Sequence, residues 1–153
     1  MDPWYLPLKL VHVLSAIVAV GSNVTYFIWL AAMRGRSQQE QSFALRTIKV
    51  IDSRLANPAY AILPITGVIM VLLNHIGFTT FWVAAAIVLY ILVGVFAGAL
   101  FAPALRRLSE IVDREGPDSP GYADAMKRTS ARGLLTMLPI AGILYVMVLK
   151  PTP

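Results

Sequence analysis

No Asp, Glu, Lys or Arg occurs between Arg54 and Arg106. A helix that crosses the hydrocarbon core of a bilayer needs about 20 consecutive apolar residues, so this stretch is long enough for two spans. Of the 153 residues, 58% are hydrophobic and only 14% are charged, whereas soluble domains have roughly 25% charged residues. One folded core could not bury so much apolar surface. The sequence therefore predicts an integral membrane protein.

Apolar runs at residues 6–33, 58–75, 81–105 and 133–149 meet the length of a span. We expect an all-α fold, an integral membrane antiparallel four-helix bundle that forms a single membrane domain over residues 1–153. The first run is longer than the apolar core of a signal peptide and has no basic leader. We therefore expect it to remain in the mature protein.

The basic residues indicate an orientation. All Lys and Arg residues except Lys9 and Lys150 lie in or beside the two segments that follow the first and third runs. Because such residues collect on the cytoplasmic side, we expect both termini outside, both basic segments inside, and residence in the bacterial cytoplasmic (inner) membrane. The net charge of +5 then reflects orientation and the lipid bilayer as partner, not nucleic acid. The absence of cysteine excludes thiolate metal sites and cysteine nucleophiles.

Both basic segments contain helix signals. Ser37 and Glu40 have the spacing of a capping box, and Ala44, Ile48, Ile51 and Leu55 recur at helical spacing. This pattern predicts a short amphipathic helix on the inner leaflet or under the bundle. We expect it to end at Asn57, which would cap the second span, with Pro58 in the first turn. After the break at residues 116–121, a second short helix is expected to start at Ser119 and Pro120 and run toward Arg132.

Polar side chains form a stripe on the first span. Their spacing places them on one helix face, and lipid disfavours such a face, so it is expected to point into the bundle. The stripe either lines a site or path, or supplies interhelical hydrogen bonds of about 0.6 kcal/mol each. Its members are His12, Ser15, Ser22, Asn23 and Tyr26.

The two histidines suggest a ligand site. His12 is about one turn inside the first span and His75 is at the end of the second, so the two imidazoles are expected at a similar depth. A haem or metal site is one interpretation. The other is a buried, hydrogen-bonded His12 and an interfacial His75.

Small residues recur every four positions in the third span, at Ala86, Gly94, Gly98 and Ala102 with Tyr90 between. Such a face lets another helix approach closely. We expect Gly94 and Gly98 to pack against a helix of this bundle, of a partner membrane protein or of another copy of the chain.

A short repeat relates the second and fourth spans, because Leu63–Gly67 (LPITG) matches Leu138–Gly142 (LPIAG). Both spans run in the same direction, so a duplication would relate two halves by an axis along the membrane normal. Chance is the alternative, since these residues are common in membrane helices.

The segment from Lys9 to Ala16 (KLVHVLSA), followed by Gly21, resembles the first helix of small bacterial membrane proteins assigned to a domain of unknown function. These resemble CopD-like copper-resistance proteins and HemJ-type protoporphyrinogen oxidases. Arg54-Leu55, Pro58-Ala59 and Gly67 resemble the entry to the HemJ-type second helix, and Trp82 resembles the entry to the third. The resemblance implies a shared fold and haem association at His12. This chain departs from the HemJ type after Trp82, where Val83 replaces a basic residue.

Three functions follow from these patterns. The first is a non-catalytic accessory or assembly subunit of a larger membrane complex, because the chain has no P-loop, nucleophile elbow, zinc-protease or dinucleotide motif. The second is a b-type haem-binding redox protein with His12 as a ligand. The third is a transporter of a small molecule or metal that uses the polar stripe.

Overall fold

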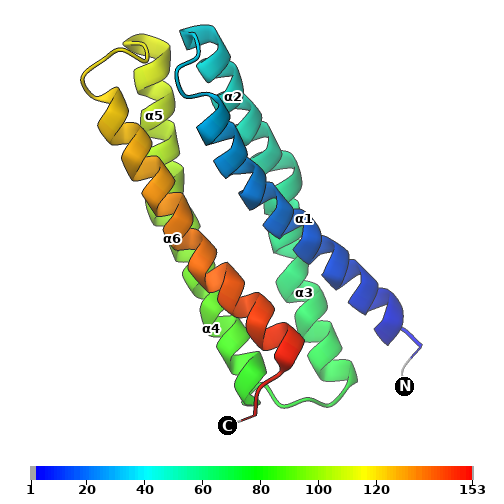
Figure 1. Cartoon of the computed structure of the whole chain (residues 1–153). Helices are drawn as coiled ribbons and strands as arrows, with labels where there is room; N and C mark the ends of the chain where they lie inside the picture. Colours follow the sequence, from blue (N-terminus) through cyan, green and yellow to red (C-terminus); the bar gives the residue numbers. More distant parts are fainter. Residues whose placement is uncertain (1–2, 153) are drawn as a thin grey trace.

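The computed structural model describes residues 3–152 and contains four long helices, which confirms the predicted all-α four-helix membrane fold (Figure 1). Two of the four are built from several segments. In chain order the segments are α1 (Tyr5–Ala32), α2 (Gln38–Ile51), the π-helical turn η1 (Asp52–Ala56), α3 (Asn57–Leu73), α4 (Phe81–Val95), the π-helical turn η2 (Phe96–Phe101), α5 (Ala102–Arg114) and α6 (Tyr122–Leu149).

The basic segments do not form separate helices beside the bundle. Instead, α2, η1 and α3 form one helix of 36 residues, and α4, η2 and α5 form one of 34 residues. At about 1.5 Å of rise per residue these helices are about 50 Å long, well beyond the hydrocarbon thickness of about 30 Å. α6 likewise begins at Tyr122, slightly after the predicted start, and runs through Arg132 into the last span.

Each π turn carries its helix through a proline. The amide of Asn57 donates to the carbonyl of Asp52, and that of Ala102 donates to the carbonyl of Ala97, both five residues back. Pro58 and Pro103 follow directly, and a proline cannot donate to the carbonyl four residues back. In the wider π turn the backbone amide just before each proline donates to the carbonyl five residues back instead of four, and the helix continues past the proline. The prediction that Asn57 caps a new helix is therefore wrong.

The π turn η1 also changes which residues face the core. Ala44 and Ile48 are buried as predicted, but Leu55 is exposed and Ala56 is buried in its place. A π turn accommodates one more residue than an α turn, so the regular spacing that predicted Leu55 on the apolar face fails after Ile51.

The predicted capping box is confirmed at the start of α2. The side chain of Ser37 accepts from the Glu40 amide, and the Glu40 carboxylate accepts from the Ser37 amide at 3.0 Å. The hydrogen bonds from the Ser37 side chain and backbone lower the pKa of the Glu40 carboxyl. Its stabilising contribution is therefore present at neutral pH and is lost as the pH falls through that lowered value.

The helices form two hairpins, α1 with α3 and α4 with α6. Within the described residues, no Cα atom of α3 lies within 8 Å of one in α4, although a short turn joins them. The hairpins meet mainly at the end with the two interhelical loops, where α2 packs against α5. We call this the basic end, and the opposite end, with both chain termini, the terminal end (Figure 1).

The hydrophobic core lies at the basic end. It includes Leu30, Leu45, Ile48, Leu108 and Val112, all almost fully buried. At the terminal end large apolar side chains are mostly exposed, as expected for helices surrounded by lipid. The molecule thus combines a compact amphipathic bundle at one end with two loosely joined hairpins at the other.

Candidate functional site: the polar seam between α1 and α3

The polar stripe of α1 faces α3 and η1. Ser15 and Ser22 are buried, and His12, Asn23 and Tyr26 each make a hydrogen bond to a side chain of the neighbouring helix. We call this set of contacts the polar seam. The polar seam has the arrangement expected of interhelical hydrogen bonds. Whether it can also bind a ligand depends on which donors and acceptors these bonds leave free.

His12 pairs with a residue that sequence analysis did not single out. Its Nδ1 lies 2.7 Å from Oγ1 of Thr66, and the same oxygen lies 2.9 Å from the carbonyl of Ile62 in the preceding turn. A threonine hydroxyl has one proton. When it donates to that carbonyl, it must accept from Nδ1–H of His12. Nε2 then carries the lone pair that a metal or haem iron would require.

Gly67 allows the imidazole to lie close to α3. A Cβ atom at this position would be 3.4 Å from Cε1 of His12. The matching glycine of the repeat, Gly142 in α6, faces Leu89 of α4 in the same way, with Cδ1 at 3.1 Å from an added Cβ. Both motif glycines therefore lie against a side chain of the other helix in their hairpin. At the offset of the repeat, however, the counterpart of His12 is Ile87, which is exposed, so these contacts leave duplication and chance both open.

A second group of contacts is centred on Tyr60, and one of them joins the two hairpins. Nδ2 of Asn23 donates to the hydroxyl of Tyr60 at 2.7 Å, and the hydroxyl of Tyr90 donates to the backbone carbonyl of Tyr60 at 2.6 Å. In a regular helix that carbonyl would accept from residue 64, but Pro64 has no N–H. Tyr90 thus satisfies the carbonyl group that the proline leaves without its helical donor. The position of a proline four residues after Tyr60 is the sequence signal for this contact.

We expect Tyr90→Phe to lower the free energy of unfolding by about 1 kcal/mol, because it leaves a carbonyl unpaired. In a Pro64→Ala background the loss is expected to be smaller, since the alanine introduced there supplies a backbone donor to the same carbonyl. A double-mutant cycle measured by SDS titration of the detergent-solubilised protein checks this coupling. Equal losses in the two backgrounds would contradict the assigned role of Pro64.

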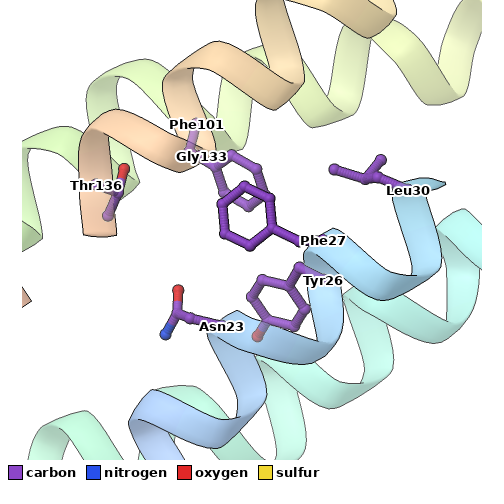
Figure 2. A pocket seen from close by; sticks show the side chains of 7 residues that line it. All are labelled: Asn23, Tyr26, Phe27, Leu30, Phe101, Gly133 and Thr136. Carbon is purple, nitrogen blue, oxygen red and sulfur yellow. The ribbon is translucent and has the colours of Figure 1, made fainter. Parts of the chain in front are cut away.

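The seam ends in a polar pair near the basic end. The hydroxyl of Tyr26 donates to Oδ1 of Asp52 at 3.1 Å. Beside it is a cavity of about 10 Å³ between α1, η2 and α6, about the space for one water molecule. Figure 2 shows Asn23 and Thr136 on opposite sides of this space. The other lining residues are Tyr26, Phe27, Leu30, Phe101 and Gly133.

The remaining predicted site residues lie elsewhere. His75 is exposed in the turn after α3, with a φ of 53°. His12 is level with Thr66, about 10 Å of helix before the end of α3, so the structure does not bring the histidines together. Gly94 and Gly98 are exposed, and an added Cβ would meet nothing within 4 Å. Residues 3–152 hold no group of three His, Cys, Asp or Glu side chains able to bind a metal.

The four helices, each long and apolar enough to cross a membrane, define a multi-pass integral membrane protein. Residues 6–151 match the family described as a predicted integral membrane protein, DUF2269, and the chain belongs to this family. The predicted assignment to a membrane family of unknown function is thus confirmed, whereas the likeness to CopD-like and HemJ-type proteins stays a prediction. No curated protein and no solved structure matches the chain.

Proposed function

We propose that the protein is a non-catalytic accessory or assembly subunit of a larger complex in the bacterial cytoplasmic membrane. The observation that carries the proposal is the run of exposed small residues at Gly94, Gly98 and Ala102, where an added Cβ at either glycine would meet nothing within 4 Å. Glycine within a helix costs about 1 kcal/mol relative to alanine. Lipid chains do not require small residues, but a closely approaching helix does.

The small-residue face continues from Gly94 and Gly98 to Ala102, which is also exposed, whereas Ala86 is buried and Tyr90 is half-buried. A partner helix would therefore bind along η2 and the start of α5. This region lies beside the junction of the two hairpins. The distribution of Lys and Arg supports a cytoplasmic position for the basic end.

Purification from native membranes in a mild detergent tests the proposal. We expect the chain to migrate with a different protein, and Gly94→Ile with Gly98→Ile to release it. Gly21→Ile is the matched control, because Gly21 is exposed on α1 and also has nothing within 4 Å of an added Cβ. Migration of the unaltered chain as a monomer or homodimer, or release by Gly21→Ile as well, would contradict the proposal.

The His12–Thr66 contact supports a second candidate, a b-type haem-binding redox protein with His12 as one axial ligand. The hydrogen bond to Nδ1 is the orienting contact that ligating histidines usually have. This candidate predicts a Soret band after expression with ample haem. His12→Ala is expected to abolish the band, whereas His75→Ala leaves it intact. Absence of the band in the unaltered protein, or its survival in His12→Ala, would exclude His12 as a haem ligand.

A further inference from the structure

A polar cleft lies at the basic end, away from the polar seam. It has a volume of about 600 Å³ and separates the α1–α2 loop from the α5–α6 loop. Gln38 connects the two sides, because its Nε2 donates to the carbonyl of Val112 at 2.7 Å. Volumes of about 300–1,000 Å³ are typical of small-molecule sites. The lining residues are Gly35, Arg36, Ser37, Gln38, Gln41, Glu115, Gly116, Pro117, Asp118 and Tyr122.

Two residues that line this cleft have unpartnered polar atoms. Within residues 3–152, the buried side-chain nitrogen and oxygen atoms without a hydrogen-bond partner are Oε1 of Gln41, Oγ of Ser119 and the hydroxyl oxygen of Tyr122, and of these residues Gln41 and Tyr122 line the cleft. Gln41 is fully buried, and its Nε2 is already used by the carbonyl of Arg36 at 2.9 Å. Gln41 lies beside Tyr122 without a hydrogen bond of ordinary geometry. Buried polar groups are normally paired, so Oε1 of Gln41 and the hydroxyl of Tyr122 are expected to pair with water or with a polar ligand.

Charges of opposite sign lie on the two loops. Arg36, on the α1–α2 loop, has only a long exposed contact to Glu40 at 3.8 Å. Glu115 and Asp118, on the α5–α6 loop, are exposed and form no ion pair within the described residues. A ligand with an anionic and a cationic end could therefore bind both loops at once.

We propose that this cleft binds a small zwitterion, a free amino acid or a short peptide. Its carboxylate pairs with Arg36, and its ammonium group faces Glu115 and Asp118. Oε1 of Gln41 and the hydroxyl of Tyr122 complete the hydrogen bonding between the two charged ends. This site is independent of the lipid-facing glycines and of His12.

Calorimetric titration of the purified full chain tests the site with glycine and glycylglycine as probes. Saturable binding of at least one of the two probes is expected. Tighter binding of glycine identifies a free amino acid as the ligand type, and tighter binding of glycylglycine identifies a peptide. N-acetylglycylglycine and glycylglycinamide each lack one charge, and both are expected to bind about ten-fold more weakly than glycylglycine, the loss of one charge-assisted hydrogen bond. Lack of saturable binding at millimolar probe, or equal binding of all the dipeptide forms, would overturn the proposal.

Variants separate direct contact from a structural role. Arg36→Gln is expected to weaken the binding of glycylglycine about ten-fold. The binding of glycylglycinamide is expected to stay unchanged, because that probe has no carboxylate. Tyr122→Phe removes one hydroxyl and should weaken the binding of every probe. Arg46→Gln and Tyr145→Phe are the matched controls, since both residues are exposed outside the cleft. Binding that survives Arg36→Gln and Tyr122→Phe would also overturn the proposal.

Discussion

Leu108→Ala is expected to lower the free energy of unfolding by about 2–5 kcal/mol, the usual range for a buried leucine. Leu108 is 0% exposed and belongs to the core cluster with Leu45, Ile48 and Val112. This cluster lies where α2 packs against α5, so the substitution weakens the main junction of the two hairpins. SDS titration of the purified protein measures the change.

Leu138→Ala is the matched control, because Leu138 lies in α6 and is 65% exposed. Removing the same atoms from a lipid-facing or detergent-facing position leaves no cavity, so the effect is expected to stay within about 0.5 kcal/mol. A larger loss for Leu138→Ala than for Leu108→Ala would mean that the stabilising core lies within the spans instead of at the basic end.

Gly133→Val is expected to destabilise the protein by about 1–3 kcal/mol through overpacking. Gly133 is buried in α6, and an added Cβ would lie 3.2 Å from ring atoms of both Phe27 and Phe101. These two rings come from α1 and η2, so a larger side chain must push apart three helices. Gly133 also lines the cavity that lies between Asn23 and Thr136 (Figure 2), and this cavity is expected to widen in the variant.

Gly94→Val provides the comparison, because valine there would meet open space. The isolated protein should unfold with nearly unchanged stability, whereas binding to a partner helix should be lost if the proposed function holds. Thermal unfolding in detergent, followed by circular dichroism, compares the two variants. Equal destabilisation by Gly94→Val and Gly133→Val would show that Gly94 packs within the bundle.

Among the candidate site residues, the sequence predicted an inward-facing stripe correctly but not its partners. His12, Asn23 and Tyr26 share a face because helical periodicity fixes their direction. Thr66, Tyr60 and Asp52 could not be paired with them, since those contacts depend on how far one helix is shifted along the other. No local pattern determines that shift.

The hydrogen bond from Tyr90 to the Tyr60 carbonyl was likewise predictable only in part from the sequence. The sequence reveals that Pro64 removes a donor, but not which side chain replaces it. Likewise, Pro58 signals a helix start in the sequence, whereas η1 carries the helix through it. In the structure η1 packs against α1, a contact between elements that no local pattern around Pro58 reveals.

By itself, the sequence determined that the chain spans a membrane four times, because the requirement for a span is a property of about 20 consecutive residues. It also determined the capping box at Ser37 and Glu40, whose groups are one helical turn apart. Only the tertiary structure decided that the core lies at the basic end, that Gly94 and Gly98 face outward, and that a polar cleft forms between two loops distant in sequence. These features arise from contacts between helices, and lipid-exposed apolar residues carry little information about which helix lies beside which.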